Sequence, residues 1–336
     1  MMVMKRSLVL GIGHYVPPRV ITNKDLEKIM DTSDEWIQQR TGIKERRYVE
    51  NGIGNAEMSY EATRLALKRA GLEPNKIDLI ILGTLSPDYT FPGDAVFLQE
   101  KLGLAGIPAL DIRQQCSGFI YGLSIADQFI KTGMYKTVLV VGTEVHSSGL
   151  DFSTRGRDVT VLFGDGAGAI IVGESEKSED RGILSTHLHA DGKYAKELWT
   201  EAPTSRHHPT RITHEMIEEG RVFPKMNGRA VFVMAVKKFQ EVIKEALDKN
   251  HMSIGDVSLF IFHQANLRIV QAVSEAMGIP MEKTFNNIQR YGNTTAASIP
   301  IALSEAYQEG KIYSGAIVCL ASFGSGFTWG SVLIKW

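Results

Sequence analysis

Three residues that lie far apart in the chain have side chains suited to nucleophilic catalysis: Cys116, His263 and Asn293. Cys116 precedes an amphipathic helical pattern, and the unpaired N–H groups at a helix start favour a thiolate. His263 ends a strongly apolar run, and Asn293 precedes a second helical pattern. Taken singly, each also suits a structural role, as a buried cysteine, a hydrogen-bonded histidine or an N-cap asparagine.

The elements that must position these residues alternate between strand-like and helical patterns. Short apolar runs bounded by turn residues are typical of buried strands, and apolar residues at helical spacing indicate amphipathic helices. This alternation predicts an α/β fold. The strand-like runs are 76–84, 106–112, 136–144, 166–174, 256–264 and 315–323, and the helical patterns are 59–71, 116–133, 235–250 and 298–310.

The second half of the chain repeats features of the first. The run at 77–84 matches the run at 257–264, and Cys116 and Asn293 each stand 17 residues before a glycine that ends a helical pattern. We therefore expect two related α/β halves in which Cys116 and Asn293 occupy corresponding helix starts. Packing about a pseudo-twofold axis would bring both to His263. The predicted halves are residues 1–175 and 176–336.

Composition and charge narrow the class of protein. The 336 residues are 43% hydrophobic and 22% charged, which is ordinary for a globular protein. The net charge of -1 provides no overall electrostatic attraction to nucleic acid or to a membrane surface. Two cysteines without a C-x-x-C pair suit a reducing compartment. The apolar stretch near the start of the sequence is too short for a signal peptide. No run of 18 apolar residues, the length needed to span a membrane, occurs in the sequence. We expect a soluble, cytoplasmic protein.

Several long blocks of the sequence resemble the 3-oxoacyl-acyl carrier protein synthase III enzymes, which start bacterial fatty-acid synthesis. The resemblance implies an α/β thiolase-like fold, in which two pseudo-duplicated halves form a five-layered αβαβα sandwich. It covers nearly the whole chain, and the order and spacing of the blocks agree with the family. The blocks are 25–47, 116–133, 163–169, 263–269, 291–300 and 323–331.

The resemblance implies a role for each of the three residues. Cys116 would accept an acyl group from acyl-CoA, and malonyl-acyl carrier protein would then lose carbon dioxide and attack that group. His263 and Asn293 would donate hydrogen bonds to the thioester oxygen on which enolate charge develops. The backbone N–H groups of Cys116 and Ser325 would form the oxyanion hole of acyl transfer. No metal and no cofactor would be needed, with acyl-CoA entering as a substrate.

The resemblance also implies residues that bind CoA and the carrier arm. Trp36 would stack on adenine, and Arg40 would contact phosphate. Asn266 and Arg268 match positions at the pantetheine arm and the entrance for carrier protein or CoA. A second CoA-contacting arginine is expected in the segment 151–166, where the spacing to FGDG selects Arg157 and the local order TRG selects Arg155.

The same family pattern implies a homodimer. Phe91, in YTFPGD, resembles a residue that crosses the dimer interface to close the partner's acyl pocket, although core packing would suit it equally. The basic residues Arg40, Arg268, Lys237 and Lys238 suit either an acidic carrier protein or a solvated surface.

Three departures from the family pattern leave alternatives open. Polar residues at 113–115 precede Cys116, the segment 193–228 is longer than is common, and Ala321 stands where some members have an acid. A secondary-metabolism or long-chain paralogue therefore remains an alternative, using malonyl-CoA, condensing two acyl chains or transferring an acyl group to a hydroxyl. A non-catalytic acyl-binding protein on the same fold is a second alternative.

His187 and His189 are two possible metal ligands, but no third ligand lies near them in the sequence, so a metal site is not expected there.

Overall fold

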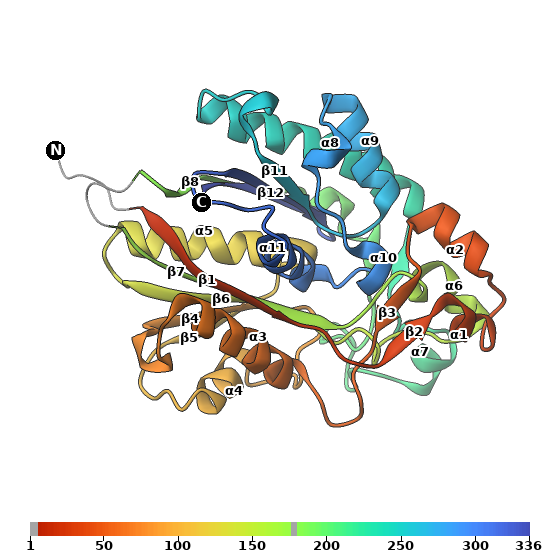
Figure 1. The fold of residues 1–336 in the computed structure, drawn as a ribbon. Helices are drawn as coiled ribbons and strands as arrows, with labels where there is room; N and C mark the ends of the chain where they lie inside the picture. Colours follow the sequence, from red (N-terminus) through yellow and green to blue (C-terminus); the bar gives the residue numbers. More distant parts are fainter. Residues whose placement is uncertain (1–5, 176–179) are drawn as a thin grey trace.

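The computed structural model describes residues 6–175 and 180–336, which form two mixed β-sheets and the helices that cover them (Figure 1). The first sheet has the order β1-β7-β6-β4-β5, and the second has the order β11-β12-β13-β8. The strands of the first sheet are β1 (Ser7–Tyr15), β4 (Leu79–Gly83), β5 (Ala109–Ile112), β6 (Thr137–Glu144) and β7 (Gly166–Glu174). Those of the second are β8 (Gly182–Ala190), β11 (Leu259–Phe262), β12 (Ile317–Gly324) and β13 (Thr328–Lys335).

Helices lie between the sheets and on both outer faces, which makes five layers (Figure 1). One core, between the sheets, contains side chains of both sheets and of the two central helices. Two further cores lie under the outer helices. The central helices are α5 (Gly118–Lys131) and α11 (Ser298–Gln308), and the outer helices are α3 (Asn55–Ala70) and α4 (Asp94–Lys101) on the first sheet and α8 (Gly228–Lys249) and α9 (Leu267–Met277) on the second. The predicted αβαβα sandwich is confirmed.

Burial on both faces explains why the strands were visible in the sequence. In β4, Leu79 and Ile81 enter the central core, whereas Ile80 and Leu82 enter the core under α3 and α4. A strand covered on both faces has no polar side to alternate with its apolar side. All six predicted strands and all four predicted helices are present, with ends that differ by up to four residues except at α8, which begins seven residues before the predicted start at 235.

Strands β1, β8 and β13 were not predicted. β1 contains the Gly-x-Gly of LGIGHY, and these glycines let α3 approach closely: a Cβ on Gly13 would lie 2.2 Å from the backbone oxygen of Ala62. β8 is only partly buried along most of its length. The proposed boundary between halves falls at residues 176–179, which lie outside the described residues, so the division at 175 stays a prediction.

The helix starts show where the sequence repeat was misaligned. A 3₁₀ turn precedes each central helix, Gln115–Ser117 before α5 and Thr295–Ala297 before α11. The first residue of each turn, Gln115 or Thr295, has a left-handed φ, of 44° and 50°. Cys116 therefore corresponds to Ala296, and Asn293 lies ahead of the turn. The prediction that Cys116 and Asn293 are equivalent is wrong, because α11 has 11 residues and α5 has 14.

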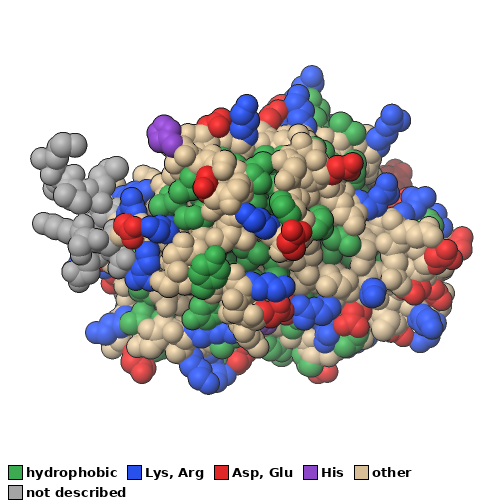
Figure 2. Space-filling model, turned by 45° about the horizontal axis from the view of Figure 1, so that its top comes forward, with side chains coloured by type: hydrophobic (Ala, Val, Ile, Leu, Met, Phe, Trp, Pro, Cys, Tyr) green, Lys and Arg blue, Asp and Glu red, His purple; other side chains and the backbone are tan. Residues whose placement is uncertain are grey.

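Smaller elements surround one end of the sandwich. They include the predicted long segment 193–228, which forms two short strands and one short helix rather than a separate layer. On the face shown in Figure 2, basic and acidic side chains are interspersed, in keeping with the net charge of -1. The smaller elements are α1 (Asn23–Glu27), α2 (Asp34–Thr41), α6 (Arg157–Thr160), α7 (His214–Glu218), α10 (Ile288–Tyr291), β2 (Val20–Thr22), β3 (Glu45–Arg47), β9 (Leu198–Trp199) and β10 (Lys225–Met226).

Candidate active site

Cys116 lies in the turn before α5, and the opposite sheet holds that turn in place. The Ser322 hydroxyl of β12 donates to the Cys116 carbonyl oxygen at 2.7 Å, and the Ser117 hydroxyl donates to the carbonyl of Thr328 at 3.1 Å. Gly324, at the end of β12, touches the cysteine so closely that a Cβ there would lie 2.5 Å from Cys116 Cβ. The C-terminal sheet thus positions the candidate nucleophile of the N-terminal half.

Burial decides the charge of the thiol. It raises the pKa of Cys116 to about 12, with the nearby Glu144 carboxyl adding to the rise. The backbone N–H groups of Ser325 and of Cys116 itself, and the side chain of Thr295, hydrogen-bond the sulfur and oppose that shift. The helix-start argument anticipated a lowered pKa, and desolvation outweighs it. The thiol is therefore neutral at pH 7 and needs a proton acceptor when it attacks.

Hydrogen bonds fix the tautomer of His263, which follows β11. Its Nδ1 lies 2.7 Å from the Ser298 hydroxyl, which itself donates to the backbone carbonyl of Thr295 at 2.9 Å. Because the hydroxyl proton is used there, Nδ1–H of His263 donates to Ser298 and Nε2 carries the lone pair. Nε2 is buried without a partner among the described residues, and burial lowers the imidazole pKa to about 3. His263 is a neutral group with a free acceptor.

Asn293 is held by its backbone and by its side-chain oxygen. Its N–H donates to the Leu162 carbonyl at 2.7 Å, and its own carbonyl accepts from the Gly164 N–H at 3.0 Å. Its Oδ1 accepts from the Thr295 N–H at 2.8 Å. The amide Nδ2–H₂ group is left to donate to a ligand.

The three side chains face one cavity of about 460 Å³. Elements distant in sequence supply them: the turn before α5, the end of β11 and the segment before α11. The cavity extends from Cys116 to α2 and the start of α9. Seven of the residues that were predicted from the sequence line its wall: Trp36, Arg40, Cys116, His263, Asn266, Arg268 and Asn293.

Two arginines flank the Trp36 indole near the outer end of this cavity. The guanidinium carbons of Arg40 and Arg157 lie 4.5 and 5.0 Å from the ring centroid. Arg155 instead pairs with Asp151 at 2.6 Å and donates to the backbone carbonyl of Glu218. Arg157 is thus the arginine placed beside Trp36, where an aromatic face and two fixed positive charges suit a nucleotide carrying phosphates.

Asn266 and Arg268 lie at the start of α9. Asn266 caps this helix by accepting from the Arg268 N–H at 2.9 Å, and its amide donates to the Arg40 carbonyl at 3.0 Å. Both polar ends of Asn266 therefore serve to fix α9 against α2. The Arg268 guanidinium carbon lies 5.9 Å from the Phe232 ring centroid, on the cavity wall.

Of the two remaining predicted residues, Ser325 lies at the candidate site and Phe91 does not. The Ser325 N–H faces the Cys116 sulfur, while its side chain donates to the carbonyl of Leu198 in β9. Phe91 is 82% exposed and does not line the cavity of its own chain. The expectation for Phe91 concerned a second copy of the chain and stays a prediction.

Sequence reasoning missed four residues around the candidate catalytic side chains: Thr295 and Glu144, which act on the Cys116 thiol, Ser298, which contacts His263, and His146, which contacts Thr295. Burial raises the pKa of Glu144 to about 8, against hydrogen bonds from Ser86, Leu85 and Thr84. A carboxylate that ends the apolar run at 136–144 was a signal that could have been used. Thr295 and Ser298 lie in the block around Asn293, but nothing in the sequence indicated their contacts.

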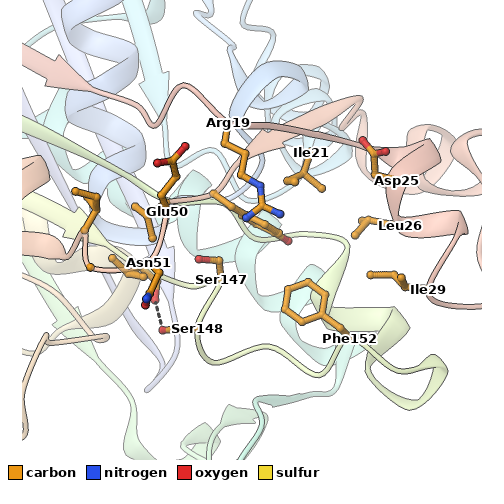
Figure 3. Close-up of a pocket in the computed structure, with 15 residues that line it drawn as sticks. Arg19, Ile21, Asp25, Leu26, Ile29, Glu50, Asn51, Ser147, Ser148 and Phe152 are labelled. Atoms are coloured by element: carbon orange, nitrogen blue, oxygen red, sulfur yellow. Dashed lines mark hydrogen bonds between the residues drawn. The ribbon is translucent and has the colours of Figure 1, made fainter.

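A second cavity, of about 520 Å³, lies elsewhere and is not the site of this chemistry (Figure 3). Arg19, Glu50 and Phe152 surround it, and none of the three candidate catalytic side chains reaches it. His187 and His189 both contact Glu245, at 3.2 and 2.6 Å. Within residues 6–175 and 180–336, no group of three or more His, Cys, Asp or Glu side chains is arranged to hold a metal ion.

Comparison with known proteins supplies the family context. The family model described as 3-oxoacyl-[acyl-carrier-protein (ACP)] synthase III matches residues 110–192, and its C-terminal counterpart matches residues 247–336. The chain is 44% identical over 329 residues to the beta-ketoacyl-[acyl-carrier-protein] synthase III of Aliivibrio fischeri, covering 98% of this chain and 99% of that protein. The solved 3-oxoacyl-[acyl-carrier-protein] synthase III of Aquifex aeolicus is 44% identical, with a TM-score of 0.90 over 98% of this chain and 100% of that one. The structure of the Thermus thermophilus enzyme is 40% identical to this chain and has the same TM-score, with 98% of this chain and 99% of that one covered.

Proposed function

Because this chain belongs to the 3-oxoacyl-[acyl-carrier-protein] synthase III family of condensing enzymes, we propose that it joins an acyl-CoA primer to malonyl-acyl carrier protein. The products are 3-oxoacyl-acyl carrier protein, CoA and carbon dioxide, and the reaction initiates fatty-acid synthesis. One observation carries the proposal: Cys116, His263 and Asn293 face a single cavity with Trp36 and Arg40 on its wall.

In the first stage Cys116 takes the acyl group. Its sulfur attacks the thioester carbon of acyl-CoA, a new carbon–sulfur bond forms, and the bond to the CoA sulfur breaks. The thiol proton passes through a base beside the sulfur to the departing CoA thiolate, so no proton is gained or lost overall. The backbone N–H groups of Cys116 and Ser325, which both oppose the rise of the thiol pKa and so lie beside the sulfur, would stabilise the oxyanion of this step.

In the second stage malonyl-acyl carrier protein loses carbon dioxide, and the electron pair of the broken carbon–carbon bond becomes an enolate. The enolate oxygen accepts hydrogen bonds from the Asn293 amide and from His263 Nε2, which has taken one proton from solvent as negative charge gathers beside it. The enolate carbon attacks the acyl group, and the Cys116 sulfur leaves and recovers that proton. The stage consumes one proton.

The cavity mouth suits the proposed partners. Trp36 with Arg40 and Arg157 offers a stacking face and phosphate donors for CoA. Arg268 adds a positive charge on the path of an acidic carrier protein. Lys238 is mostly covered and its ammonium lies 4.5 Å from the Trp329 ring centroid, so its role is in packing rather than at the entrance.

The proposal includes a cytoplasmic homodimer that needs no metal or cofactor, and that binds neither nucleic acid nor a membrane. β5 is an edge strand, and Leu110 on it is 41% exposed; Tyr89 and Phe91 are 60% and 82% exposed. An edge strand beside exposed apolar groups favours pairing with a second copy. No described helix has the length and apolar content needed to cross a membrane.

A long-chain or specialised paralogue is the alternative. The long segment 193–228 contributes Leu198 and Met226 to the cavity wall, close to the Cys116 loop, so it is placed to affect which acyl chains enter. Such an enzyme would use the same residues with a different acyl donor or with malonyl-CoA.

Intact-mass measurement after mixing the protein with acyl-CoAs from acetyl to dodecanoyl tests the proposal. We expect an acyl adduct on Cys116 in the wild type and in Cys319→Ala, and none in Cys116→Ala. Adding malonyl-acyl carrier protein should remove the adduct with release of carbon dioxide, and malonyl-CoA should not. Preference for the longest chains would support the paralogue, and no adduct from any chain would exclude the proposal.

A further inference from the structure

Glu305 is a buried carboxylate on the central helix α11, and the chemistry above does not use it. The residue is 8% exposed. Its Oε1 accepts from the Tyr291 hydroxyl at 2.6 Å, and its Oε2 accepts from the Asn287 amide and the Arg290 guanidinium, each at 2.8 Å. Three donors from residues 287–291 therefore converge on one carboxylate.

The segment that Glu305 holds leads directly to Asn293. Asn287 precedes the short helix α10 and Tyr291 ends it, so Glu305 is bonded to both ends of this helix. Gly292 follows with a left-handed φ of 65°, and Asn293 comes next. The position of α10 therefore sets where the chain enters the Asn293 turn.

The helix that carries Glu305 also holds His263. Ser298 is the first residue of α11, and its hydroxyl lies 2.7 Å from His263 Nδ1. Ser298 and Glu305 are about two helical turns apart on α11. One helix thus carries an anchor for each of the two side chains that would donate to the enolate, His263 and Asn293.

A second contact joins the two segments directly. Gln264 follows His263 in the chain and is 1% exposed. Its Oε1 accepts from the Asn287 N–H at 3.1 Å, and its Nε2 donates to the carbonyl of Phe262 in β11 at 2.7 Å. Asn287 is therefore bonded on one side to Glu305 and on the other to the strand end that carries His263.

We propose that Glu305 is a positioning residue for decarboxylation, which anchors α10 to α11 and so sets the Asn293 amide against His263. The inference deepens the proposed function and rests on it. Glu305 does not line the cavity, so it acts through Asn293 rather than on the substrate. Two donors can share the enolate oxygen only if each lies roughly 2.7–3.1 Å from it, which requires the two segments to keep one relative position. The buried network contributes this single arrangement of α10 rather than stability.

Two half-reactions measured separately test this role: acylation of Cys116 by acyl-CoA, followed by intact mass, and release of carbon dioxide from malonyl-acyl carrier protein. Glu305→Gln keeps the size of the side chain but turns an amide toward its three donors. We expect kcat for carbon dioxide release to fall about 10- to 100-fold with KM unchanged, because the misplaced donors act on charge that develops in the transition state. Acylation should stay within about twofold, since contacts with β12 and β13 hold the Cys116 turn.

Tyr291→Phe removes one of the three donors and leaves the carboxylate in place. It should slow carbon dioxide release about threefold to tenfold, as for loss of one hydrogen bond to a charged group. The double variant should be no slower than Glu305→Gln alone, because both changes act on the same network. Tyr291→Phe carries the test if Glu305→Gln does not fold.

Asp127 supplies a matched control, because it is a buried carboxylate on the other central helix, α5. It accepts from the Ser7 hydroxyl at 2.8 Å, pairs with Lys131 at 2.6 Å and does not line the cavity. Asp127→Asn should lower the free energy of unfolding in urea and leave both half-reactions within about twofold of the wild type.

Two results would overturn the inference while the proposed function stands. One is an equal loss of both half-reactions in Glu305→Gln, which would make its role purely structural. The other is wild-type carbon dioxide release in Glu305→Gln, or in Tyr291→Phe where Glu305→Gln does not fold. A wild-type protein that forms no adduct with any acyl-CoA would instead overturn the proposed function, and this inference with it.

Discussion

The two cysteines of the chain are both buried, but their surroundings differ. Cys116 is 7% exposed and Cys319 is fully buried, and burial raises the pKa of both thiols to about 12. The sulfur of Cys116 faces two backbone N–H groups, a threonine side chain and a cavity. Cys319 lies in the middle of β12, among apolar side chains under α8 and α9, and burial alone sets its pKa.

This difference shows that burial and pKa do not identify a nucleophile. Hydrogen-bond donors and an open cavity do, and at Cys116 the Ser325 donor comes from the other half of the molecule. Cys319 pairs in register with Phe260 on β11 and Leu333 on β13 and packs in the apolar core under α8 and α9. A buried thiol without donors behaves as a small apolar side chain.

The largest predicted effect separates the two cysteines by activity. Cys116→Ala should lower condensation by a factor on the order of 10⁴ or more, because no other group can carry the acyl chain. Cys319→Ala should retain wild-type turnover and lose about 1 kcal/mol of unfolding free energy. Steady-state assays and urea unfolding of both variants measure this. Substantial condensation by Cys116→Ala would remove the distinction between the two sites.

The second prediction concerns the side-chain amide of Asn293, a hydrogen-bond donor that shares a cavity with Cys116. Asn293→Ala removes the amide that faces the cavity, so decarboxylation should slow about 10² to 10³-fold, as for loss of one oxyanion donor. Acylation of Cys116 should remain within a few-fold, since the amide is not used there. Carbon dioxide release and adduct formation are measured separately on the same preparation, and equal losses in both would assign Asn293 to the fold of the site rather than to decarboxylation.

Much of this arrangement was predictable, for a physical reason. Strands covered on both faces must be apolar throughout, so β4, β6 and β7 stand out in sequence. The candidate trio was found because each residue lies at the end of such an element or before a helix, where chains return to one edge of the fold.

The remaining features depend on contacts between distant segments. Cys116 appeared equivalent to Asn293 because α11 is shorter than α5, and only the positive φ of Thr295 places the turn correctly. The thiol pKa rises because the fold buries the sulfur, which no local pattern indicates. His146 meets Thr295 across 149 residues of chain, so its contact was invisible to spacing.

The third prediction uses what the cysteines share. An unfolded thiol loses its proton near pH 9, but both folded thiols keep theirs to about pH 12. Between these values the folded state binds more protons, so stability falls as pH rises, by up to about 1.4 kcal/mol per pH unit for each thiol. Cys116→Ala and Cys319→Ala should flatten this alkaline loss equally. Urea unfolding between about pH 8 and about pH 10, roughly one unit on either side of the unfolded value, measures this loss. A flattening in only one variant would show that the fold does not raise the pKa of both thiols alike.

The smallest effect concerns Ser325, whose backbone and side chain do different things. Its N–H faces the Cys116 sulfur, and any residue but proline keeps that donor. Its hydroxyl only ties the loop to the Leu198 carbonyl, a bond worth about 1 kcal/mol. Ser325→Ala should therefore change acylation by no more than about twofold, since that is the change expected of a residue whose backbone alone acts on the sulfur. A hundredfold loss would mean that the hydroxyl, and with it the position of β9, controls the donors that distinguish Cys116 from Cys319.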